Sequence, residues 1–446
     1  MLYIISQRMA PTITIHVDNS TYLIPMLSIG AIISKNSKFD VVIILGRQFD
    51  HSSKTRKIID NTTLQVQYLK NIDIISFYPF SKFREVYELF NHIVNFLQIK
   101  FSLNTMFRRK KVVLTIFPAD NRFDYSYYSK IYSSSEIPLI IVPNWFAGKS
   151  EILGTKHNSS VNVQSNLRLF FLRRFRRDYL EFINDNEESR VISCKTFSES
   201  FADLILGTTP PNPWILHSGY SDFILIDSES MRDQALELGF NNNKLIVTGS
   251  ITHDTIYKEI NRFKNSNTSK SIRILFALPP DFFTSRGKFC LDYSNQTQMI
   301  ELVLTALRSK TKSSVTISLH PSTNFDEIFK SQLENKFNVF FSNQPIEILL
   351  ANSTHFLASV SSTIRWALSL GIPVLNFDFY KFDYIDYQKA KNYIRVNSHE
   401  EFLNALDSFL QMGGEKSLDE KRYWGNIDGN AEQRILNSIF KVCRSI

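Results

Sequence analysis

The sharpest chemical signal in the sequence is a histidine at the end of an apolar run. Residues 315–321 read VTISLHP, which predicts a buried parallel strand that ends at His320 and Pro321. Proline cannot donate to a sheet ladder, so His320 is expected to project from the strand end. An imidazole there could bind a phosphate or a ribose hydroxyl, or act in catalysis. Taken alone, the pair also fits a histidine that only packs or caps a helix.

A cluster of hydroxyls follows a second apolar run. Ser361, Ser362 and Thr363 separate the strand-like THFLAS from the helix-like IRWALSLG. Hydroxyls and backbone N–H groups at a helix start bind anions, although the same residues also serve as plain N-caps. Because the cluster and His320 follow strands of one predicted sheet, both are expected at one edge. The pairing therefore predicts a phosphate site more specifically than either motif does.

Two further loops are candidates for the same nucleotide site. Pro279 follows a predicted strand, and Arg286 lies in the loop after it, where a guanidinium could close over a diphosphate. Ser250 ends the run KLIVTGS, in which Gly249 permits a tight turn. The first loop also fits a solvated surface loop, and the second also fits the start of a connecting helix.

The N-terminal half supplies candidate bases and acceptor contacts. Asp18 and Asn19 follow the run TITIHV, and Asp120 follows the run KVVLTIF. A hydroxyl that attacks an anomeric carbon needs a carboxylate within hydrogen-bond reach, so Asp18 and Asp120 are candidate bases. Arg122 and Asn144 also follow strands and, with Asn19, are predicted to line the acceptor side. Each aspartate also fits an ordinary loop or cap.

These residues depend on strands and helices that alternate along the chain. Apolar runs predict buried strands, and amphipathic stretches between them predict helices, an arrangement that gives doubly wound parallel sheets. In the first half we expect strands at 39–46, 72–78, 111–117 and 137–143, with helices at 22–33 and 82–98. The polar stretch 262–271 separates this half from a second alternating set that begins at residue 272.

The predicted class is therefore α/β, with two Rossmann-like domains facing a central cleft. The domains are 1–262 on the acceptor side and 263–446 on the nucleotide-sugar side, and the last helix, around 431–443, could cross back. Ligands bind at the carboxyl ends of the strands in such sheets.

Composition narrows the function classes. The formal charge is +8, which favours anionic partners. Three cysteines without paired spacing disfavour a disulfide framework or a cysteine zinc site, and fit a reducing cytoplasm. The sequence contains no P-loop, dinucleotide-binding, nucleophile-elbow or HExxH motif, and no DxD triplet. No nucleic-acid-binding motif is present either, so nucleic acid is not an expected partner.

One segment, 166–183, combines aromatic spacing with arginines. Phe171, Phe175, Tyr179 and Phe182 would share one face of a helix flanked by five arginines. Such a composition is typical of a helix that lies on an anionic membrane. A packed helix with a solvated basic face is the other interpretation.

Taken together, the motifs resemble the GT-B superfamily of metal-independent nucleotide-sugar enzymes. They are VTGS…HD before the domain boundary, HP after a central strand, and SS…ALSLGIPV after the next βα unit. The His-Pro and Ser-Ser motifs are similar to those of bacterial sialyltransferases and Kdo transferases, which use CMP-activated acid sugars. The resemblance implies that His320, Pro321, Ser361 and Ser362 bind the donor phosphate and that neither a metal nor another cofactor is required.

The resemblance further implies a glycosyltransferase of bacterial capsule or lipopolysaccharide synthesis. It would move a sugar from a nucleotide donor to a glycan or lipid-linked hydroxyl acceptor. We expect a cytoplasmic protein held peripherally at the inner membrane by the segment 166–183. The alternatives are an enzyme like the non-hydrolysing UDP-N-acetylglucosamine 2-epimerases, a CDP-glycerol-type glycerophosphotransferase, and a non-catalytic scaffold of this fold.

Overall fold

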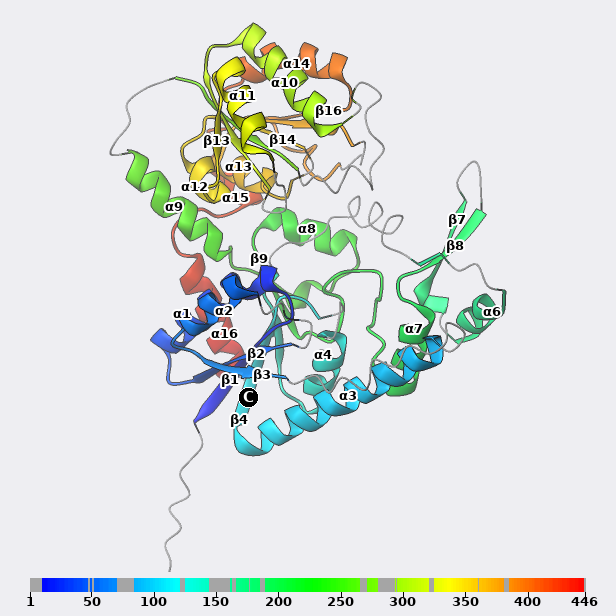
Figure 1. Ribbon diagram of the computed structural model, residues 1–446. Coiled ribbons are helices and arrows are strands. Elements are labelled where there is room, and N and C mark those ends of the chain that lie inside the picture. The colour runs from blue at the N-terminus through cyan, green and yellow to red at the C-terminus, as the bar shows by residue number, and fades with distance from the viewer. Residues whose placement is uncertain are drawn as a thin grey trace, which may run out of the picture.

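The structure is a computed structural model in which most of the chain from residue 10 to residue 444 is described. The description leaves out 1–9, 47–48, 50–51, 70–83, 121–124, 144–160, 163–165, 176, 185–188, 265–270, 280–292, 294, 321–324, 360, 381–384 and 445–446. Two parallel sheets with helices packed around them form the body of the protein (Figure 1).

The N-terminal sheet has seven parallel strands in the order β10-β9-β5-β4-β1-β2-β3. They are β1 (Pro11–Val17), β2 (Asp40–Leu45), β3 (Gln65–Tyr68), β4 (Lys111–Phe117), β5 (Leu139–Ile141), β9 (Phe223–Ile226) and β10 (Leu245–Val247). Its helices are α1 (Leu23–Asn36), α2 (Ser53–Asp60), α3 (Arg84–Arg109), α4 (Tyr125–Ser134) and α8 (Glu229–Glu237). The predicted strand at 72–78 lies outside the described residues, and the third strand of the winding is β3.

The C-terminal sheet has six parallel strands in the order β13-β12-β11-β14-β15-β16. They are β11 (Arg273–Ala277), β12 (Ser314–Ser318), β13 (Phe340–Ser342), β14 (His355–Ala358), β15 (Val374–Phe377) and β16 (Tyr393–Val396). Its helices are α10 (Gln296–Lys310), α11 (Glu327–Phe337), α12 (Ile346–Ala351), α13 (Ile364–Leu370), α14 (His399–Gln411) and α15 (Leu418–Trp424). Both sheets reverse their winding beside their first strand, which confirms the predicted doubly wound architecture.

The order in which strands are added reverses between β1 and β4 in one sheet and between β11 and β14 in the other, and these are the two topological switch points. The central strands are apolar because both of their faces are covered. In β4, for example, the last four residues are buried. The crevice outside a switch point is where doubly wound sheets bind ligands.

A small antiparallel sheet departs from the prediction for 166–183. Helix α6 (Asn166–Phe175) ends at Phe175, a 3-10 turn follows at Arg177–Tyr179, and β7 (Leu180–Asn184) pairs with β8 (Ser189–Ser193), which also pairs with β6 (Val161–Asn162). The predicted single helix is therefore wrong. Tyr179 is buried and its hydroxyl donates to Asp203 on α7 (Phe197–Leu206) at 2.7 Å.

The last helix, α16 (Ala431–Arg444), packs on the N-terminal sheet although it follows the C-terminal one (Figure 1). Its apolar residues Ile435, Leu436, Ile439 and Val442 are buried in a core with β1, β2 and α1. The helix α9 (Ile251–Lys264) leads out of the N-terminal sheet and packs beside α16. The two connections lie side by side.

Asp254 on α9 fixes the start of α16. Its Oδ1 accepts from the backbone N–H of Ala431 at 3.0 Å, and its Oδ2 accepts from that of Glu432 at 2.8 Å. A carboxylate at a helix N-terminus satisfies unpaired donors and interacts favourably with the helix dipole. No helix in the described part of the chain is both long and apolar enough to cross a membrane.

The Asp254 contact predicts a stability effect. Asp254→Ala should lower the free energy of unfolding by about 2 kcal/mol, because it leaves two N–H groups of α16 without an acceptor. Urea unfolding followed by circular dichroism measures the change. Asp326→Ala is the control, since Asp326 caps the exposed start of α11 through one 3.2 Å bond and should cost no more than about 1 kcal/mol. Equal effects in the two variants would contradict the role given to Asp254.

Candidate functional site

Three predicted nucleotide-binding segments follow three neighbouring strands of the C-terminal sheet. Pro279 follows β11, His320 follows β12, and Ser361 follows β14. In the register of the sheet Ala277 lies opposite both Ser318 and Ala358, so the segments leave the sheet at the same level. The structure therefore brings these residues to one edge, beside the β11/β14 switch point.

His320 is half-buried at that edge. Burial lowers the pKa of its imidazole below the usual 6.5, so the ring is neutral at pH 7. A neutral imidazole can donate one hydrogen bond to a phosphate oxygen, and it gains a positive charge only if the ligand stabilises its protonated form.

The hydroxyl cluster before α13 is partly bonded within itself. Ser361 Oγ lies 2.6 Å from Thr363 Oγ1 and accepts from the backbone N–H of Thr363 at 3.3 Å. Ser362 is exposed next to them. Sequence analysis missed Ser359, which is buried directly after β14 and whose hydroxyl has no hydrogen-bond partner in the described part of the chain.

Asp18 lies at the switch point of the N-terminal sheet. Its backbone N–H donates to the Tyr125 hydroxyl at 2.8 Å, and its carboxylate lies against the Cα of Gly46. A Cβ on Gly46 would lie 1.2 Å from Asp18 Oδ1, so only glycine leaves room for this carboxylate. Burial, together with the nearby charge of Asp18, raises the pKa of Tyr125 well above its usual value. Asn19 follows and accepts from Tyr22 N–H at 3.0 Å, which starts a 3-10 turn.

Asp120 follows the neighbouring strand β4 but turns into the protein. It is fully buried, and its two oxygens accept from the backbone N–H groups of Gly219 and Ser221, each at 3.0 Å. Burial raises the pKa of its carboxyl, and the two amide bonds oppose that shift. In this arrangement Asp120 holds the loop before β9 in place.

The VTGS turn also has a structural partner. Gly249 has a φ of +80°, a backbone conformation that favours glycine, and a Cβ there would lie 3.0 Å from Ala431 of α16. Arg434 of α16 donates to the Thr248 carbonyl at 2.7 Å. Ser250, predicted to contact the nucleotide, therefore lies in a turn that receives the last helix.

A polar group that sequence analysis missed joins the two carboxyl edges. Arg365, 5% exposed on α13, donates to Gln234 of α8 at 3.0 Å and lies 3.7 Å from Asp227, the residue after β9. The two sheets therefore face each other across this contact. His253 on α9 is fully buried nearby, and burial is the main cause of its lowered pKa. Asp227 could have been found by the sequence pattern that identified Asp18, namely an aspartate directly after an apolar run.

Four predicted site residues lie outside the described residues. These are Arg122, Asn144, Arg286 and Pro321.

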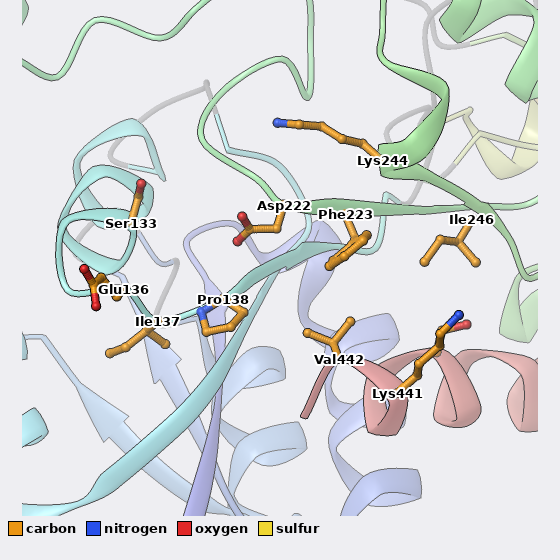
Figure 2. A pocket seen from close by; sticks show the side chains of 11 residues that line it. Ser133, Glu136, Ile137, Pro138, Asp222, Phe223, Lys244, Ile246, Lys441 and Val442 are labelled. Atoms are coloured by element: carbon orange, nitrogen blue, oxygen red, sulfur yellow. The ribbon is translucent and has the colours of Figure 1, made fainter. Parts of the chain in front are cut away.

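A cavity of about 450 Å³ lies at the opposite edge of the N-terminal sheet (Figure 2). Pro138, Asp222 and Lys244 line it, and each precedes a strand, so the cavity is at the amino edge. Asp222 accepts from Leu139 N–H at 2.8 Å and Lys244 donates to the Ser221 carbonyl at 2.7 Å. These groups bond to the backbone and lie at the edge opposite the switch point, so the cavity is not the candidate site.

The environment of Asp120 predicts a fold defect rather than a purely catalytic one. Asp120→Asn places an amide NH₂ against a backbone N–H, so the free energy of unfolding should fall by about 2 kcal/mol. Chemical denaturation measures it. Asp222→Asn is the matched control, because this exposed aspartate accepts one backbone amide, and its effect should stay below about 1 kcal/mol. Unchanged stability with abolished turnover would instead make Asp120 the base.

Comparison with known proteins supports the fold. No protein-family model and no curated protein matches the sequence. A UDP-GlcNAc 2-epimerase from Neisseria meningitidis, solved with UDP-GlcNAc, is 14% identical with a TM-score of 0.54, over 97% of this chain and 100% of that one. The calicheamicin glycosyltransferase CalG4 is 8% identical with a TM-score of 0.56, over 98% and 100%. A UDP-glucosyltransferase from Polygonum tinctorium is 12% identical with a TM-score of 0.53, over 98% and 99%. The chain has the GT-B fold, as the resemblance implied.

Proposed function

We propose that this protein is a glycosyltransferase that uses a nucleotide-sugar donor. One observation carries the proposal: Pro279, His320 and the hydroxyl residues Ser359 and Ser361–Thr363 follow adjacent strands at the switch point of the C-terminal sheet. The contact between Arg365 and Asp227 directs that edge toward the N-terminal sheet, where Asp18 lies at the other switch point. A donor on one edge and an acceptor on the other fit this arrangement.

In the proposed reaction an acceptor hydroxyl attacks the anomeric carbon of the donor. The bond from that carbon to the phosphate oxygen breaks, the nucleotide leaves, and a carboxylate takes the hydroxyl proton. We assign phosphate stabilisation to His320 and the hydroxyls of Ser361 and Ser362, rather than to a metal ion. Asp18 is the better candidate base, since both oxygens of Asp120 already accept backbone N–H groups.

The proposed donor, acceptor and location follow from the His-Pro and Ser-Ser motifs and from the basic residues of the chain. We propose a CMP-linked acid sugar as donor and a glycan or lipid-linked acceptor in surface-polysaccharide synthesis. The proposed location is the cytoplasmic face of the inner membrane. The net charge of +8 supports an anionic partner, and so do the exposed arginines Arg173 and Arg174 of α6 and Arg177 of the 3-10 turn after it.

Epimerisation of a UDP-sugar is the second candidate. It is favoured by the likeness to the Neisseria meningitidis enzyme, which was solved with UDP-GlcNAc and is covered along its whole length. Conversion of UDP-GlcNAc to its 2-epimer without an acceptor would favour this function over transfer.

Nucleotide binding is the decisive test. We expect one of CMP, CDP, UMP, UDP or GDP to raise the melting temperature, in the presence of EDTA as well, and His320→Ala to abolish the rise because it removes a phosphate donor. CMP would indicate an acid-sugar transferase, and UDP a hexosamine transferase or an epimerase. His92→Ala, at a half-buried histidine on α3, is the control. If none of the nucleotides stabilises the protein, the proposed function is wrong.

The lowered pKa of His320 predicts a pH dependence. The free imidazole is neutral at pH 7, and a bound phosphate would raise its pKa by stabilising the protonated form. The complex then takes up a proton, so the nucleotide Kd should decrease as the pH is lowered from about 7.5 toward 6. Isothermal titration in two buffers of different ionisation enthalpy measures the uptake. A Kd with the same slope in His320→Gln would exclude His320 as the titrating group.

A further inference from the structure

The longest helix of the N-terminal domain has an apolar outer face. In α3 five large apolar side chains are between 38% and 75% exposed. They are Val86, Tyr87, Phe90, Leu97 and Phe101. Surface helices of soluble domains usually turn polar residues outward, so a stripe of this kind marks an interaction surface.

The exposed residues form one continuous stripe. At about 100° per residue, Val86, Phe90, Leu97 and Phe101 fall within roughly 60° of one another around the helix axis. The opposite face holds Phe96, Ile99, Leu103 and Met106, which are buried in the core. The helix is therefore apolar on two sides, and among the residues that the structure describes only one of these sides is buried.

The charges on the outer face are all of one sign. Lys100, Arg108 and Arg109 are exposed there or at its border. The two carboxylates of α3 point to neighbouring helices instead: Glu85 pairs with Arg168 of α6 at 2.5 Å, and Glu88 accepts from Ser198 of α7 at 3.0 Å. An apolar stripe with a basic rim is complementary to an anionic lipid surface.

Helix α6 lies beside the start of α3 and also exposes aromatic and basic side chains. The Arg168–Glu85 pair holds α6 beside the first turns of α3, and Phe171 of α6 packs on Phe201 of α7 with ring centres 6.1 Å apart. Phe170 and Phe175 of α6 are exposed, and so are the arginines next to them. In Figure 1, α3 runs along the lower rim of the molecule, with α6 and α7 at one end.

We propose that the outer face of α3, flanked by α6, docks on an anionic membrane surface. This inference rests on the proposed membrane location and moves its main contact from the segment 166–183 to α3. Helix α3 leads directly into the sheet, since it ends at Arg109 and β4 begins at Lys111. At 26 residues α3 is about 39 Å long against about 23 Å for β4, and its first turns contact α7 through Glu88 and Ser198.

Vesicle sedimentation of the full chain tests the surface. We expect binding to vesicles of phosphatidylglycerol and phosphatidylethanolamine at low salt, and at least tenfold weaker binding to phosphatidylcholine. Phe90→Ser/Leu97→Ser/Phe101→Ser should reduce partitioning at least tenfold, and Lys100→Gln/Arg108→Gln should weaken binding and flatten its salt dependence. The matched control is Ile328→Ser/Phe340→Ser/Leu418→Ser, which removes three equally exposed apolar side chains of the C-terminal domain and should bind as the wild type does.

Two outcomes would overturn the inference. One is that the wild type does not bind the anionic vesicles, or that the α3 triple variant binds them as well as the wild type does. The other is a wild-type dimer that the triple variant converts to a monomer without vesicle binding, because the stripe would then be a contact between two copies. The melting temperature of the triple variant should equal that of the wild type. Its nucleotide-induced shift should also persist, so that failure here is separate from failure of the proposed function.

Discussion

The arrangement of the two domains depends on one helix, α16, which joins them. Helix α16 follows the C-terminal sheet in the chain, yet its apolar face completes the N-terminal core. Burying its four apolar side chains is worth on the order of 8 kcal/mol, which is comparable to the whole stability of a typical domain. Asp254 accepts from the backbone N–H of Ala431, and the Thr248 carbonyl accepts from Arg434. The VTGS…HD segment therefore binds the first turn of this helix. With α9 beside it, the chain crosses between the domains twice at one place.

That double crossing decides which edges of the sheets meet. Arg365 reaches Asp227 and Gln234 from the opposite domain, and each of these residues follows a strand or lies on the helix after one. The carboxyl edges of the two sheets, where the switch points lie, thereby face each other. Gly46 adds a local constraint, since its missing side chain is what lets the Asp18 carboxylate lie at the N-terminal switch point.

The central strands of both sheets could be predicted because they are covered on two faces and their runs are almost purely apolar, whereas the edge strand β3, which reads QVQY and is partly exposed, was not predicted. The apolar spacing at 166–183 led to the wrong prediction of a single helix, because spacing alone does not show where a helix ends and the backbone turns. Phe171 and Tyr179 do contact α7, but Tyr179 reaches Asp203 from a 3-10 turn, and the chain continues as a strand. The roles of the aspartates after the strands could not be predicted from the sequence either. Asp18 and Asp120 look alike in sequence, and what separates them are contacts with residues far along the chain, such as Gly219, 99 positions after Asp120.

The packing of α16 on the N-terminal sheet also affects how the chain folds during synthesis. The core around β1 and β2 needs Ile435 and Ile439, which are synthesised after all strands of the C-terminal sheet. The first sheet can therefore collapse early on the ribosome but cannot reach its final packing until the second domain has been translated and the last helix has been released from the exit tunnel. For that interval the groove that receives α16 is open apolar surface, and it is the part of the nascent protein that a chaperone would have most reason to cover.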